Sequence, residues 1–128
     1  MKLGLYNAIL HDRPLPEAIV AIADVGLTGI EINTGGFLPA VHVPTFDEIL
    51  ISDTARDDYL GIFEGTGVSI AGLNCNGNPL HPNPDIGPKH AEDIRRSIRL
   101  AERLGQHRVV TMSGLPGGES SATRTNWS

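Results

Sequence analysis

The sequence predicts an α/β fold: a (β/α)8 barrel represented by about its first four β/α units, with parallel strands. Three observations carry this prediction. Short apolar segments recur along the chain, and helical patterns separate them. Each predicted strand is followed by a polar loop that is longer than the turn preceding it. The 128 residues are about half of the ~250 that eight units typically need.

The first β-α-β unit is predicted within residues 3–33. Residues 3–9 are mostly apolar, as expected for a strand covered on both faces. The helix that follows has Pro16 in its first turn, and Gly26 is placed to end it in a left-handed cap. Residues 30–33 form the second strand, and the short links predict a parallel pair with a right-handed crossover. The inward stripe of the helix comprises Leu15, Ile19, Ile22 and Val25.

A long loop, residues 34–46, follows the second strand, and we expect its His42 to lie at the surface, like His11 in the first loop. Thr45 and Glu48 match a capping box that begins a helix ending at Ile51. A further helix begins at a cap provided by Ser52 or Asp53. Its inward stripe comprises Ala55, Tyr59, Ile62 and Phe63.

The second half of the chain begins with a strand over residues 68–75 and its loop, residues 76–86. The clearest helix then runs from Pro88 to a stop at Gly105, and a fourth strand covers residues 108–112. The inward face of that helix is predicted to comprise Ala91, Ile94, Ile98, Ala101 and Leu104. Residues 113–128 are predicted to be an irregular tail, and its Trp127 to be a remnant of a loop over a missing half.

Two other architectures accept this order of elements. One is an open doubly wound sheet, and the other is a small complete four-stranded α/β domain. The site-like loop 113–119 favours the barrel, because a doubly wound domain would place another helix there. We therefore interpret residues 1–128 as the N-terminal half of a barrel, from a truncated reading frame or a degraded gene. The strand containing Val109 would then be an exposed sheet edge.

Composition excludes several classes of function. The net charge of −5 argues against a nucleic-acid-binding surface. There is no signal-peptide pattern and no apolar run of ~18 residues, so we expect a cytoplasmic protein without a membrane partner. The single cysteine, Cys75, rules out an intrachain disulfide and fits a reducing compartment. We interpret Cys75 as a small buried packing residue rather than a catalytic thiol.

Five residues at or after strand ends are candidate substrate contacts. Asn74 and Asn76 should point into a barrel mouth and suit sugar hydroxyls, although loop-stabilising Asx turns are an equal alternative. His81 either orients a substrate or ligates a metal, or it hydrogen-bonds the backbone between two prolines. Glu31 lies in a buried strand, so its charge needs a structural partner or a substrate. Glu119 follows two glycines that would let the backbone approach a ligand, unless the tail is simply flexible.

Three segments carry a resemblance to a known family: Gly-Leu-Asn-Cys-Asn-Gly-Asn-Pro-Leu-His-Pro (72–82), residues 91–105, and Val-Val-Thr-Met-Ser-Gly-Leu-Pro-Gly-Gly (109–118). The Gly-Ile-Glu-Ile strand at 29–32 is also common there. With these segments the chain resembles the sugar phosphate isomerase/epimerase family, the xylose-isomerase-like barrels. The resemblance implies metal-dependent aldose–ketose isomerisation or epimerisation of a small sugar or polyol.

The same resemblance implies a divalent metal ion at the barrel mouth. Its ligands in the family are mostly carboxylates and histidines at the ends of later strands, which this sequence does not contain. We therefore expect this chain alone neither to bind the metal nor to catalyse the reaction, and we assign it no metal ligand. One alternative is an inactive half-barrel that self-associates through its exposed edge or binds a complementary half. Another is a metal-dependent endonuclease of the same superfamily, against which the acidic charge counts.

Overall fold

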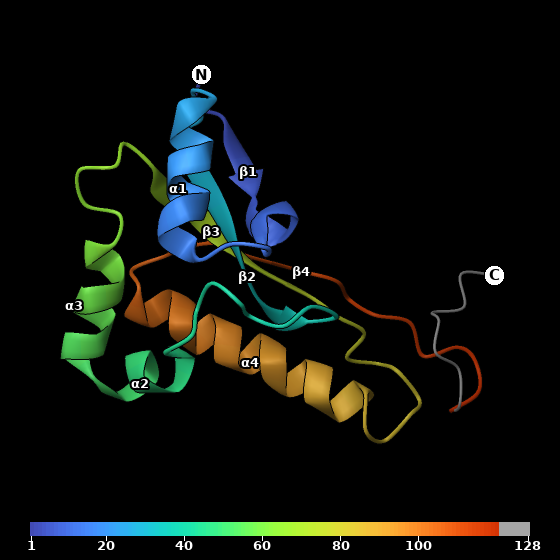
Figure 1. Cartoon of the computed structure of the whole chain (residues 1–128). Coiled ribbons are helices and arrows are strands. Elements are labelled where there is room, and N and C mark those ends of the chain that lie inside the picture. Colours follow the sequence, from blue (N-terminus) through green and yellow to red (C-terminus); the bar gives the residue numbers. More distant parts are fainter. Residues whose placement is uncertain (121–128) are drawn as a thin grey trace.

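The computed structural model describes residues 1–120, in which strands and helices alternate along the chain (Figure 1). The prediction for Trp127 concerns a residue outside this range. The first half contains β1 (Gly4–Tyr6), a 3-10 turn η1 (Asn7–Leu10), α1 (Leu15–Asp24) and β2 (Gly29–Gly36). The second half contains α2 (Phe46–Ile51), α3 (Asp53–Gly61), β3 (Ser69–Asn76), α4 (Gly87–Arg103) and β4 (Val109–Thr111).

The four strands form one parallel sheet in the order β1-β2-β3-β4. Each new strand is therefore added on the same side as the one before it. A doubly wound sheet instead reverses direction at a switch point, whereas sequential addition is how a (β/α) barrel grows. The strand order thus confirms the predicted partial barrel and excludes the doubly wound alternative.

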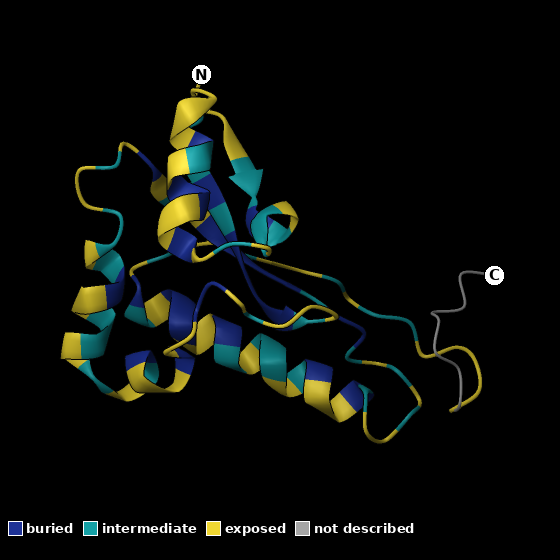
Figure 2. Cartoon of the chain, in the orientation of Figure 1, coloured by how far each residue is buried: buried dark blue, intermediate teal, exposed yellow. Residues whose placement is uncertain are grey.

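The hydrophobic core lies between the sheet and the helices. Ile30 and Ile32 of β2 and Leu73 of β3 are fully buried there. Figure 2 shows the same pattern: the central strands are buried, and the helices are buried on one side only. The helices contribute further core residues: Leu15, Ile19 and Ile22 of α1, Phe46 and Ile49 of α2, Tyr59 of α3, and Leu100, Ala101 and the adjoining Leu104 of α4. Alternate strand residues face the opposite side, where the chemistry described below is found.

Two predicted core residues are exposed. Val25 is 70% exposed, because α1 ends at Asp24 and Gly26 turns the chain with a φ of 79°. Ile98 is 55% exposed, because the buried face of α4 is rotated by about one residue and runs through Ser97 and Leu100, together with the predicted Ala101. Apolar periodicity alone did not anticipate this rotation, since a buried serine forms part of the inward face.

Two other local predictions fail and one holds. The capping box at Thr45 is wrong: Thr45 precedes α2, but its side chain makes no capping hydrogen bond. Ser52 does cap α3, since its Oγ accepts a hydrogen bond from the Ala55 N–H at 3.2 Å. β1 is shorter than predicted because the chain turns at Asn7 into η1.

No helix within residues 1–120 has the length and apolar character needed to cross a membrane.

Candidate functional site

The side of the sheet opposite the helices carries polar side chains from β1, β2 and β3. Register pairs Tyr6 with Glu31, and Glu31 with Gly72. It also pairs Asn33 with Asn74. In β2 and β3 these residues alternate with Ile30, Ile32 and Leu73, which face the helices, so the polar residues share the other face. In a barrel this face is the interior, and we call it the barrel-facing wall.

Glu31 and Asn74 form the central contact of the barrel-facing wall. The Asn74 side-chain amide donates a hydrogen bond to Glu31 Oε1 at 2.6 Å. Bonds of this kind, to an ionised acceptor, are short and about twice as strong as neutral ones. Asn74 is 5% exposed, and its Oδ1 is buried without a hydrogen-bond partner among the described residues. Asn74 therefore holds the carboxylate in a fixed position even though its own oxygen remains unsatisfied, a cost of about 1–3 kcal/mol.

Tyr6 and Asn33 connect this wall to the loop after β2. The Tyr6 hydroxyl donates to Asn33 Oδ1 at 3.1 Å, and burial, followed by the negative charge of Glu31, raises the pKa of Tyr6. The hydroxyl therefore stays protonated and can serve as this donor. Asn33 Nδ2 in turn donates to the carbonyls of Leu38 and Pro39, at 3.3 and 2.8 Å. The loop is thereby fixed over the end of the sheet.

His42 is buried, contrary to the surface position predicted for it. Asn7 Oδ1 accepts the Asn33 N–H at 2.7 Å, so its Nδ2 must be the group that faces His42 Nδ1, at 2.8 Å. Nδ1 is then an acceptor, and His42 Nε2–H donates to the Arg13 carbonyl at 2.9 Å. His42 is thus a structural residue that is held through both of its ring nitrogens. His11 is half-buried, and burial, with His42 second, lowers the pKa of His11.

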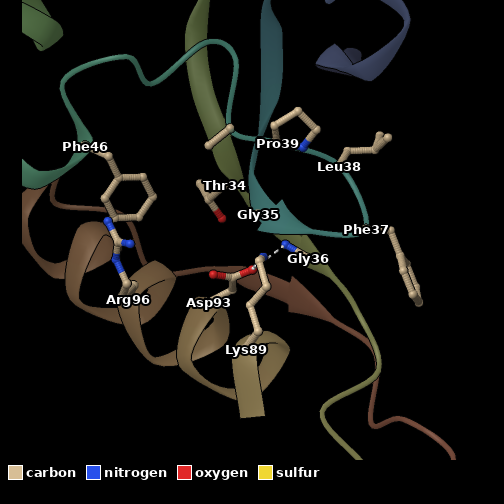
Figure 3. Close-up of a pocket in the computed structure, with 11 residues that line it drawn as sticks. Thr34, Gly35, Gly36, Phe37, Leu38, Pro39, Phe46, Lys89, Asp93 and Arg96 are labelled. Atoms are coloured by element: carbon tan, nitrogen blue, oxygen red, sulfur yellow. Dashed lines mark hydrogen bonds and ion pairs between the residues drawn. The ribbon is translucent and has the colours of Figure 1, made fainter. Parts of the chain in front are cut away.

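A cleft of about 460 Å³ lies on the helix side, between the loop after β2 and α4 (Figure 3). Gly36 N–H donates to Asp93 Oδ2 at 3.1 Å, and Lys89 pairs with the same oxygen at 2.7 Å. Arg96 lies over the Phe46 ring at 4.7 Å and pairs with Asp47. Since these charged groups are already paired, the contacts hold the loop on α4 rather than leave a charge free for a ligand.

Asn78 ties the loop after β3 to the loop after β4. Its Oδ1 accepts the Leu115 N–H at 2.8 Å, and its Nδ2 donates to the Leu115 carbonyl at 3.0 Å. The Asn78 N–H donates to His90 Nδ1 at 2.8 Å. Burial, then the charge of Lys89, lowers the pKa of His90, which agrees with an unprotonated Nδ1. A smaller cleft of about 300 Å³ lies between these two loops.

The structure brings together only two of the five predicted contacts, Glu31 and Asn74. Asn76 ends β3, where its carbonyl accepts the Phe37 N–H at 2.7 Å. His81 Nδ1 accepts the Asn83 N–H at 3.0 Å. This is the backbone hydrogen bond given above as the alternative to substrate or metal binding by His81. Glu119 is exposed. No hydrogen bond or ion pair within residues 1–120 joins these three side chains to the Glu31–Asn74 pair.

Cys75 is fully buried on the helix side, and burial raises the pKa of its thiol, as expected for a packing residue.

The sequence analysis did not identify Tyr6 and Asn33 on the barrel-facing wall. The alternation Ile-Glu-Ile-Asn at 30–33 could have found Asn33, since it places Asn33 on the same face as Glu31. It also missed Arg108, which only the register of β4 places on that face.

The described residues do not fit the divalent metal that the family implies. Within residues 1–120, no three side chains of His, Cys, Asp or Glu come close enough together to hold a metal ion. Glu31 is joined to an amide rather than to a second carboxylate. We therefore derive no chemical step through a metal from this chain.

A sequential parallel sheet with polar groups on the face opposite its helices defines this protein as part of a (β/α) barrel. Residues 19–127 match the family described as xylose isomerase-like TIM barrel, and the chain belongs to that family. The chain is also 34% identical, over 127 residues, to the uncharacterized protein YfiH of Bacillus subtilis (strain 168). That match covers 99% of this chain and 40% of YfiH, so the chain spans about two fifths of its relative.

Proposed function

We propose that this chain supplies part of the substrate-binding wall of a sugar or sugar phosphate isomerase or epimerase. The observation that carries the proposal is the Glu31 carboxylate, held at 2.6 Å by Asn74 on the barrel-facing wall. A carboxylate accepts hydrogen bonds from sugar hydroxyls, and Glu31 faces the interior of the barrel, at whose C-terminal mouth substrates bind. A divalent metal would be held by residues other than those described, so we propose that this chain alone does not catalyse the reaction.

The proposal is tested by titrating the protein with sorbitol and following the Asn74 side-chain amide by NMR. We expect its signal to shift, because the amide contacts the carboxylate that receives the hydroxyl. Glu31→Gln keeps an oxygen for Asn74 but removes the charge, so sorbitol should bind roughly tenfold more weakly. Glu48→Gln makes the same change at an exposed position in α2 and should leave binding unchanged. Absence of any sorbitol-dependent shift in the wild type, or equal binding by Glu31→Gln, would refute the proposal.

A second candidate function is self-association of the half-barrel. Within residues 1–120 the outer edges of β1 and β4 pair with no other strand. Exposed apolar side chains lie near both: Leu3 and Ile9 beside β1, and Ile98 and Val110 on the β4 side. A groove of about 480 Å³ also lies between α4 and β4. We propose that a second copy covers these edges, because β4 of each copy pairing with β1 of the other would close an eight-stranded barrel without free edges.

A further inference from the structure

Arg108 lies on the barrel-facing wall, on the other side of Gly72 from Glu31. Leu73 pairs with Val109, and the Leu73 N–H donates to the Arg108 carbonyl at 2.9 Å, which places Arg108 beside Gly72. A methyl group at Gly72 would lie 3.4 Å from both Cβ and Cδ of Arg108, so the Arg108 stem passes over this position. Glu31 is the register partner of Gly72 on its other side. The Arg108 stem therefore occupies the space that a side chain at residue 72 would take, beside Glu31.

The remaining hydrogen-bonding capacity of the wall is divided between its two sides. On the β2 side, the Tyr6 hydroxyl and the Asn33 amide already donate to protein oxygens, and the Asn74 amide donates to Glu31. A ligand there finds the Glu31 carboxylate, which is an acceptor only. On the β4 side it finds Arg108, which is exposed and forms no ion pair among residues 1–120. Guanidinium is a donor only, and its fork matches planar or tetrahedral oxyanions.

We propose that Glu31 and Arg108 together bind a polyol that carries an acidic group, either a carboxylate or a phosphate. Hydroxyls of the ligand donate to Glu31, and the acidic group accepts hydrogen bonds from Arg108. The strands that carry the two side chains are separated by two strand spacings, on the order of 10 Å, so a ligand of the size of a sugar can contact both. Repulsion by Glu31 sets the direction, because it disfavours the ligand turned end for end. This inference rests on the proposed function and adds the charge and orientation of its ligand.

The test compares three probes by NMR titration: neutral sorbitol, gluconate and sorbitol 6-phosphate. We expect one or both anions to bind about fivefold more tightly than sorbitol at low salt, and the difference to shrink as salt screens the exposed Arg108. Arg108→Gln should abolish the preference and leave sorbitol binding unchanged, whereas Arg108→Lys should keep part of it. Arg99→Gln, at an exposed arginine of α4, is the matched control and should keep all of it.

Each outcome has a definite meaning. If the anions bind more tightly in the wild type and in Arg99→Gln, but not in Arg108→Gln, the inference is supported. The anion with the larger Arg108-dependent gain identifies the acidic group as carboxylate or phosphate. If sorbitol binds with dependence on Glu31 but neither anion gains from Arg108, the inference is wrong and the proposed function stands. If no probe shifts the NMR signals of the barrel-facing wall, both the inference and the proposed function are wrong.

Discussion

At the scale of single residues, buried hydrogen bonds fix the protonation state of the side chains that make them. His90 is the clearest case that can be titrated. A backbone N–H can only donate, so the bond from Asn78 N–H requires an unprotonated His90 Nδ1. The ring also contacts Phe37 edge-on, with 5.1 Å between centroids. Protonating the ring would break the first contact and put a charge into a buried position.

The pH dependence of stability follows from the lowered pKa of His90. The ordinary pKa of a histidine is about 6.5, and the folded protein holds the pKa of His90 below that value. Well above that value both states are neutral, and His90 adds no pH dependence. As the pH falls below it, the unfolded chain binds a proton that the folded chain does not, so stability drops by up to about 1.4 kcal/mol per pH unit until the folded pKa is reached. Urea unfolding between neutral and mildly acidic pH measures this slope.

His90→Asn separates this histidine from the others. Asparagine Oδ1 can accept the Asn78 N–H but does not titrate, so this variant should lose part of the acid-induced destabilisation. The remainder belongs to groups such as His11, whose pKa is also lowered. His11→Asn is therefore the comparison, and it should keep the contribution of His90. A slope that is the same in His90→Asn and in the wild type would contradict this account.

At the scale of elements, the end of β2 depends on a glycine pair that distorts the ladder. The register between β2 and β3 shifts between Asn33 and Gly36, and Gly35 and Gly36 have φ angles of 142° and 87°. A Cβ on Gly36 would lie 2.0 Å from the Asn76 carbonyl oxygen. The same distortion lets Gly36 N–H reach Asp93 on α4. This irregularity therefore aims the loop after β2 toward α4.

Gly36→Ala should accordingly destabilise the protein strongly. The alanine would need both a left-handed backbone, at about 1–2 kcal/mol, and displacement of the Asn76 carbonyl, so we expect a total loss above about 3 kcal/mol. Gly26→Ala is the matched control, because Gly26 has a φ of 79° but no atom within 4 Å of a Cβ. Gly26→Ala should lose only the part of the free energy of unfolding that comes from the left-handed backbone. The free energy of unfolding in urea measures both, and equal losses would show that the close contact has no role.

The elements were largely predictable from sequence, but the wall was only partly so. Strand positions and order follow from alternation and from Gly and Pro signals, which are local. Which side chains meet depends on register, and the shifts between Ile30 and Glu31 and between Asn33 and Gly36 are not visible in the sequence. Glu31 and Asn74 were therefore identified separately, and their contact was not. The burial of His42 was missed for the same reason, since its partner Asn7 is 35 residues away.

At the scale of the whole molecule, the sheet has two open edges within residues 1–120, and their side chains suggest what should cover them. Val110 of β4 is 37% exposed and lies on the barrel-facing wall, as the register partner of Asn74. Exposed apolar edge strands favour pairing with another chain. A contact between β4 of one copy and β1 of another is head-to-tail, and such contacts form a closed assembly when the rotation between copies completes a ring. Two copies of four strands meet the eight that a barrel requires.

Sedimentation of the isolated chain should therefore show a dimer, with dissociation on dilution. Val110→Lys places a charge at the junction and should shift the equilibrium toward monomer, because a lysine on an edge strand opposes pairing. Ile51→Lys removes an equally apolar side chain that is 88% exposed on α2, away from both edges, and should leave the dimer intact. Circular dichroism should show the same helix and strand content in all three proteins. A monomeric wild type, or a dimer that weakens as much with Ile51→Lys as with Val110→Lys, would show that the open edges do not join two copies.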